Sequence, residues 1–175
     1  MGLTADLGGT GNPTVGADSF TTLTPTLYFG KGMGDLPDSV WALRPLAVTG
    51  TFGQAFATSA ESSDSFNFGL AVEYSFPYLE GSVKDIGLPA PFKDMIPLVE
   101  LSTSTDENGD TRGQFTGTIN PGVLWETRYF QLGLEAIVPL NSASGPHVGA
   151  MMKVDIFIDD IFPSVFGFPI FGGEN

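Results

Sequence analysis

Large apolar residues alternate with small or polar ones along much of the chain, which is the period expected of β-strands. The clearest stretch runs from Phe66 to Tyr78, where every second residue is apolar. The apolar positions are Phe66, Phe68, Leu70, Val72, Tyr74, Phe76 and Tyr78. Asn67, Gly69, Ala71, Glu73 and Ser75 form the opposite face. A strand of this length exceeds the roughly 5 or 6 residues usual in globular sheets and suits the roughly 9 to 11 needed to cross a bilayer.

The same alternation recurs in three stretches nearer the C-terminus, which begin at Phe115, Phe130 and Val148. In each stretch the second face is polar or small, as a barrel lumen can accept. Weaker alternation marks residues 20–30, 43–53 and 95–104, and a poor candidate lies at residues 3–8. Together these segments predict about eight strands and almost no helix.

The pattern favours an all-β fold, an antiparallel up-and-down transmembrane β-barrel formed by residues 1–175 as a single domain. The eight strands could close as a small barrel or form part of a larger one. A soluble β-sandwich or a lipocalin-like binding module would also bury one face of each strand, and it remains an alternative.

Two sets of candidate residues follow from the alternation. We expect the apolar set to face lipid: Phe66, Phe68, Leu70, Val72, Tyr74, Phe76, Leu132, Leu134, Val154 and Ile156. We expect the polar set to face a lumen: Arg44, Glu73, Glu100, Gln131, Glu135, Lys153 and Asp155. The polar set could favour cations or polar solutes in a pore, or could form ion pairs that fill a narrow, non-conducting barrel.

The connections predict two different ends, because successive hairpins of a meander alternate between the ends of a barrel. Residues 54–65, 103–112 and 141–146 are rich in Ser, Thr, Asp, Asn and Gly and are expected to be water-facing loops outside the cell. Asn108-Gly109 is a hairpin-turn signal within them. The tight turn 126–128 and three Pro-containing segments at 35–46, 85–98 and 160–170 fall at the other, periplasmic end. Short amphipathic helices or interfacial loops would explain the apolar residues Trp41, Phe92 and Phe166 there.

Composition narrows the function classes. The net charge of −13, from 20 acidic and 7 basic residues, argues against nucleic acid as a partner. No run approaches the roughly 18 apolar residues of a membrane helix, and the absence of Cys removes thiolate chemistry. The start carries no secretory signal pattern, so we expect the signal, and some N-terminal strands, to lie outside this chain.

Few residues of the sequence suggest a catalytic, metal-binding or phosphate-binding site. His147 is the single histidine and is interpreted as a loop-edge residue rather than part of a catalytic triad. Asp106 to Asp110 lacks the spacing and terminal Glu of a calcium loop and is interpreted as a hairpin tip. Gly8-Gly9-Thr10-Gly11 lacks the Lys and Ser or Thr of a phosphate loop and is interpreted as a turn. We therefore predict no enzymatic activity, no catalytic residues, no metal site and no cofactor.

The chain resembles the outer-membrane "MetA-pathway of phenol degradation" transporter-like family of Gram-negative bacteria over most of Tyr28 to Phe171. The resemblance is carried by seven segments: residues 29–39, 43–50, 74–79, 96–100, 117–123, 131–136 and 159–163. It implies an outer-membrane barrel, a lipid bilayer and the barrel-assembly machinery as partners, and uptake of aromatic or other hydrophobic compounds. Family members are usually longer at the N-terminus and end close to the Phe at position 171, whereas Gly172-Gly173-Glu174-Asn175 follows here.

The sequence therefore predicts a bacterial outer-membrane barrel for passive transport or binding of small hydrophobic or aromatic solutes. A structural or adhesion-type barrel without transport, using its polar loops outside the cell, is the alternative within the same fold.

Overall fold

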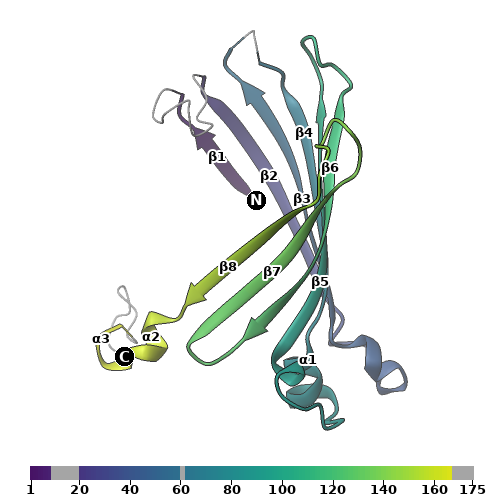
Figure 1. Ribbon diagram of the computed structural model, residues 1–175, viewed down its shortest axis with the longest axis vertical. Helices are drawn as coiled ribbons and strands as arrows, with labels where there is room; N and C mark the ends of the chain where they lie inside the picture. Colours follow the sequence, from purple (N-terminus) through teal and green to yellow (C-terminus); the bar gives the residue numbers. More distant parts are fainter. Residues whose placement is uncertain (9–19, 60–61, 167–175) are drawn as a thin grey trace.

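The computed structural model describes residues 1–8, 20–59 and 62–166 of the chain. In them eight antiparallel strands pair strictly in the order of the sequence, as an up-and-down sheet (Figure 1). The strands are β1 Gly2–Asp6, β2 Thr22–Gly32, β3 Leu46–Ala57, β4 Ser65–Tyr74, β5 Met95–Asp106, β6 Phe115–Glu126, β7 Phe130–Pro139 and β8 Gly149–Ile156. All eight predicted strands are confirmed, with ends that differ from the prediction by at most four residues.

The sheet is open. β1 and β8 form its two edges, and no pairing joins them within the described residues (Figure 1). The all-β antiparallel meander is therefore observed, whereas closure of the eight strands into a barrel is not.

Short helical turns occupy the end of the sheet where the Pro-containing segments were predicted. They are η2 Asp38–Leu43, α1 Phe76–Tyr78, η3 Leu79–Val83, η4 Phe92–Asp94, α2 Ile158–Ile161 and α3 Pro163–Phe166. None of these helices, which are all that the described ranges contain, has the length and hydropathy needed to span a membrane. Residues 167–170 of the third segment, Phe171, and the predicted turn at Gly9 to Gly11 lie outside the described residues.

β4 ends four residues earlier than the alternation predicts, which corrects the assignment of Phe76 to a lipid-facing strand position. Ser75 caps α1, because its Oγ accepts a hydrogen bond from the Tyr78 amide at 3.1 Å. Pro77 fits the first turn of a helix and cannot donate to a sheet ladder. Phe76 therefore lies in α1, where its ring packs edge-on against Tyr74 with centroids 5.4 Å apart.

β3 begins at Leu46, three residues later than predicted, which also corrects the position of Arg44. Arg44 is the residue after η2 and belongs to the β2–β3 connection, not to a strand. Pro45, which follows it, lacks the amide hydrogen that a strand would use.

Strand pairing places the alternate residues of all eight strands on two distinct faces, because directly opposed residues of an antiparallel pair share a face. One row runs Phe29, Gly50, Leu70, Leu101, Ile119 and Val138. Another runs Trp125, Leu132 and Val154. The intervening rows hold Thr, Ser, Gly, Asn and Glu, such as Thr51, Gly69, Ser102 and Thr118. We call these the apolar face and the polar face.

The apolar face is not covered by other elements of the described chain. Leu134 and Val154 are 45% and 53% exposed, and the buried apolar side chains are Leu79 and Leu98 alone among the described residues. The accessible surface is 11687 Å². A soluble folded monomer of 18.5 kDa exposes roughly 8200 Å² by the usual size scaling, so this chain exposes about 40% more. A soluble sandwich would cover this face, and no such second layer is present in the described ranges.

The loops at the other end of the sheet are polar and tied to each other, as their composition predicts. Asn108-Gly109 lies in the β5–β6 hairpin connection, as its turn signal predicts, and Gly109 has a positive φ of 70°. The Asn108 side chain binds the neighbouring loop: the Asp64 amide donates to Asn108 Oδ1 at 2.7 Å, and Asn108 Nδ2 donates to Asp64 Oδ2 at 2.8 Å.

Candidate functional site

Two adjoining hollows on the polar face are the candidate site. The larger, about 470 Å³, is lined from β2 to β5 by Tyr28, Thr49, Thr51, Ala71 and Glu100, among others. The smaller, about 300 Å³, continues from β3 across β4 and β5 to β6. Thr51, Gly69 and Ser102 line both hollows. They therefore form one trough along the sheet.

The trough is roomy because its strands contribute small side chains. A Cβ on Gly69 would lie 2.7 Å from Thr51 Oγ1, so a larger residue here would displace the Thr51 side chain. Among the polar-face residues that line the trough, Tyr28 is the largest, and it is 56% exposed. The lining combines an aromatic ring, hydroxyls and one carboxylate, which suits a small solute that has both an apolar body and a polar group.

The carboxylates predicted for the lumen lie on the polar face. Glu73 is opposite Leu98, Leu98 is opposite Gly122, and Gly122 is opposite Glu135, so Glu73 and Glu135 share one row. Glu100 lies two residues further along β5, opposite Asn120. Glu135 Oε2 and Asn120 Oδ1 are buried oxygens that no described hydrogen-bond donor reaches.

The remaining predicted lumen residues on strands also lie on the polar face, at the edge formed by β7 and β8. Gln131 is opposite Asp155, and Gly133 is opposite Lys153. Lys153 Nζ lies 3.0 Å from Asp155 Oδ2. The described ion pairs do not include Glu73, Glu100 or Glu135.

The helical end of the trough is partly capped. α1 contacts β5, and the two buried apolar residues, Leu79 at 2% and Leu98 at 7% exposure, belong to this connection and to β5. A third hollow of about 430 Å³ lies here, lined by Arg44, Glu73 and Tyr78 among others. Arg44 therefore lies near the end of the polar face, although no strand carries it.

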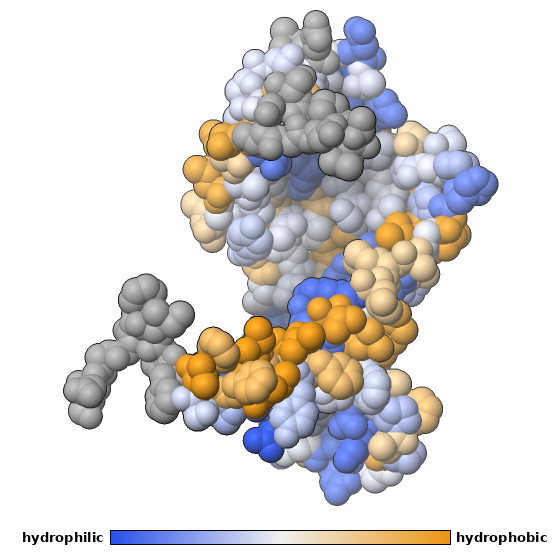
Figure 2. All heavy atoms as spheres, turned by 60° about the vertical axis from the view of Figure 1, so that its left-hand side comes forward, coloured by the Kyte–Doolittle hydropathy of each residue, from blue (hydrophilic) through white to orange (hydrophobic). Residues whose placement is uncertain are grey.

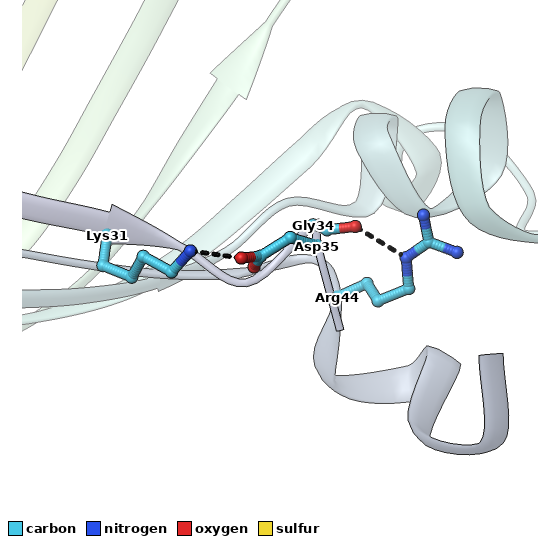
Figure 3. A network of polar contacts seen from close by, with 4 residues as sticks. All are labelled: Lys31, Gly34, Asp35 and Arg44. Atoms are coloured by element: carbon cyan, nitrogen blue, oxygen red, sulfur yellow. Dashed lines mark hydrogen bonds and ion pairs between the residues drawn. The ribbon is translucent and has the colours of Figure 1, made fainter. Parts of the chain in front are cut away.

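Arg44 holds the β2–β3 connection together (Figure 3). Its Nε donates to the Gly34 carbonyl oxygen at 2.9 Å and its Nη1 to Asp38 Oδ1 at 2.8 Å, and its side chain is 24% exposed. In the same connection Lys31 binds Asp35, and this hydrogen bond lowers the pKa of the Asp35 carboxyl below its usual value. The role of Arg44 is to fix a turn, which strand alternation alone does not reveal.

Replacing Arg44 by Met should loosen this turn while keeping the side-chain volume. Loss of a charged hydrogen bond to a carbonyl costs about 1.5 kcal/mol, so the Leu36 and Val40 amides should exchange hydrogen about tenfold faster. Both amides bond within the connection, to Met33 and Pro37 oxygens at 3.0 Å. Hydrogen exchange read by mass spectrometry measures this.

The control for Arg44→Met is Lys31→Met, because the Lys31–Asp35 pair is exposed on both sides and contributes little to stability. Equal exchange in Arg44→Met and the unsubstituted protein would contradict the anchoring role of Arg44.

The lipid-facing candidates on β4, β7 and β8 lie on the apolar face, Phe76 excepted. Phe52 is a residue that the prediction missed, and it is the centre of an aromatic cluster there. Its ring centroid lies 5.4, 6.3 and 5.1 Å from those of Phe29, Phe66 and Phe68. The prediction also missed Tyr28, Thr49 and Thr51, although the weak alternation of β2 and β3 was a signal for them.

In the described ranges, no three His, Cys, Asp or Glu side chains gather closely enough to hold a metal ion. Comparison with family models, with curated proteins and with solved structures found no match.

Proposed function

We propose that the chain is an outer-membrane β-barrel protein whose polar face forms a passive path or binding vestibule for small solutes. The observation that carries the proposal is the division of all eight strands into one exposed apolar face and one polar, hollowed face. Water does not favour such an extended apolar surface, whereas hydrocarbon does.

The dimensions of the apolar face suit a bilayer. Phe115 and Trp125 on β6 are ten residues apart, which is about 33 Å along a strand and about 25 Å once a tilt of some 40° is included. Aromatic residues mark both ends of this span: Phe56, Phe66 and Phe115 near the polar loops, and Tyr74, Trp125 and Phe130 near the short helices. These resemble the two aromatic girdles of a membrane barrel.

Trp125 adds a chemical argument. Its Nε1 is buried without a hydrogen-bond acceptor among the described residues, and its ring packs edge-on against Phe130 with centroids 5.7 Å apart. Trp residues are enriched at membrane–water interfaces, which agrees with the place of Trp125 in one of the two aromatic girdles proposed here.

Hydrophobic side chains also gather over β8 and the helices α2 and α3 (Figure 2). Ile156 is 61% exposed at the end of β8, and Val165 in α3 is 66% exposed. In the proposed membrane setting, α2 and α3 lie in the periplasmic interface with their apolar residues toward lipid.

The trough indicates the solute class. An aromatic ring from Tyr28, hydroxyls from Thr49, Thr51 and Ser102, and the Glu100 carboxylate fit a small aromatic or hydrophobic molecule that carries a hydroxyl or amine. The resemblance to the phenol-degradation transporter-like family agrees with this class. The role is passive or binding, not catalytic, with no metal or cofactor.

The test is a flux measurement on the whole chain. We expect the protein to enter phospholipid vesicles and to accelerate the exit of phenol, followed by its ultraviolet absorbance, relative to empty vesicles. Failure to enter vesicles, or a soluble monomer without detergent, would contradict the membrane assignment. Entry without any flux or phenol binding would leave a structural barrel as the function.

The polar loops favour this structural or adhesion-type barrel as a second candidate. In addition to the Asp64–Asn108 bonds, Ser63 Oγ donates to the Asn108 carbonyl at 2.8 Å, and the Glu107 amide donates to the Asp64 carbonyl at 2.8 Å. Two loops held together in this way present a fixed surface for a partner outside the cell.

A further inference from the structure

In the described fold, each of the two edges of the sheet lacks a partner strand. β1 pairs only with β2, and β8 pairs only with β7. An open sheet edge does not persist in hydrocarbon, because water cannot satisfy its backbone N–H and C=O groups there. If the proposed membrane location holds, each edge therefore needs a specific strand beside it.

The registers determine where the edges meet. The row that begins at Gly149 on β8 passes Ile137, Glu100, Ala71 and Thr49 and reaches Gly30 on β2. β1 does not reach this row, since its first residue, Gly2, pairs with Thr26. The strands are thus displaced along their length around the sheet, and bringing the middle of β1 opposite the middle of β8 requires a total stagger of about ten residues.

A stagger of this size lies within the range found in closed barrels. Ten residues span about 33 Å along a strand, and eight strands span about 38 Å across the sheet, so the slope corresponds to a tilt of about 41°. Closed barrels have tilts of roughly 35 to 45°. The registers within the open sheet therefore already match closure of β1 onto β8.

The directions and the side chains of the two edge strands also agree with pairing between β1 and β8. β1 and β8 run in opposite directions because an even number of strands separates them in a meander, so they can pair antiparallel like their neighbours. A stagger of ten residues keeps the faces matched, with Leu3 opposite Val154 and Ala5 opposite Met152 on the apolar face. On the polar face Thr4 meets Lys153, and Asp6 lies diagonal to it, within reach of an ion pair.

Charge is compatible with this register. Lys153 is the basic residue on the polar face of the eight described strands, and it lies on the edge strand β8. Asp6 is an acidic residue on the opposite edge strand, β1. Lys153 would then contact Asp155 of its own strand, 3.0 Å away, and Asp6 across the closing seam.

We propose that β1 does not pair with a further N-terminal strand but with β8 of the same chain in the membrane, with Leu3 opposite Val154, and so closes the eight strands into a barrel. The proposal rests on the membrane function above and adds the partner of each edge. It makes the trough on the polar face an enclosed vestibule.

Disulfide cross-linking tests the register directly, because the natural chain has no Cys. In the protein carrying Leu3→Cys and Val154→Cys, opposed Cα atoms about 4.5 to 5.5 Å apart suit a disulfide. We expect oxidation in phospholipid vesicles to give a monomer-sized disulfide, with the 3–154 peptide link found by mass spectrometry. The pair Ala5→Cys and Met152→Cys gives a second, independent reading of the same register.

The matched control is Leu3→Cys with Ala150→Cys, which keeps the face but shifts the partner by four residues. It should form at least about tenfold less monomeric disulfide, because the Cα atoms would then be too far apart. A disulfide of dimer size would overturn the proposal in favour of a second copy, and preferential linkage to position 150, or no linkage in either test pair, would overturn it as well. Insertion into vesicles is measured first, so failure there contradicts the membrane function, whereas insertion without the predicted disulfide contradicts closure alone.

Discussion

Leu101→Arg is expected to destabilise the protein strongly in lipid vesicles, while Ser102→Arg leaves its stability largely unchanged. The two residues are adjacent in the middle of β5 and belong to opposite faces. Leu101 is opposite Leu70 and Ile119 on the apolar face, and Ser102 is opposite Gly69 and Thr118 on the polar face.

The physical reason is the position of the charge relative to hydrocarbon. Arg at the bilayer midplane on the lipid side of a barrel costs about 2 to 4 kcal/mol, whereas a residue facing an aqueous interior avoids that cost. A loss of this size corresponds to roughly 30-fold to 900-fold in the folded-to-unfolded ratio.

Urea titration of the vesicle-inserted protein, followed by tryptophan fluorescence, measures the difference, since Trp125 lies on the apolar face. Leu101→Met serves as the control for a change of side chain without charge. Equal destabilisation by the two Arg variants would contradict a lipid-facing apolar side, and the reverse order would indicate that Leu101 faces inward.

Thr51→Trp is expected to remove most of the solute flux, or of phenol binding, while the protein still assembles. Thr51 lines both hollows on the polar face, and its Oγ1 lies beside Gly69. A Trp ring there would occupy the narrow region between them. We expect flux to fall about tenfold, because transport through a lined passage depends steeply on its open width.

Phe52→Trp is the matched control for this experiment. Phe52 is the next residue of β3, lies on the apolar face and is 41% exposed. A Trp at this position adds a similar ring on the lipid side and should leave flux unchanged. If Phe52→Trp reduces flux as much as Thr51→Trp does, the trough is not the path.

The number of strands could be predicted from the sequence because alternation is a local property. Successive side chains of a strand point to opposite faces whatever the strand packs against, so Phe66, Phe68 and Leu70 identify a face without knowledge of their partners. The prediction erred where another local interaction competed. At Ser75 a capping hydroxyl and the following Pro77 end β4, and at Arg44 a side-chain bond to Gly34 keeps the residue in a turn.

The trough could not be predicted from local alternation, because it is made by strands far apart in the sequence. Glu73, Glu100 and Glu135 were predicted to share a face, but their relative heights depend on three registers between β4 and β7. Tyr28 and Thr51 come from strands with weak alternation, and their place beside Gly69 follows only from pairing.

The sequence by itself determined that this protein is built from eight alternating strands with one apolar and one polar set of side chains, since that information is held in single residues and their neighbours. Only the tertiary structure decided the registers, the short helices that end β4 and precede β3, the Asp64–Asn108 bridge between loops, and the open edges at β1 and β8. The reason is that a shift of two residues between strands keeps every side chain on its face, so alternation alone cannot distinguish one register from the next.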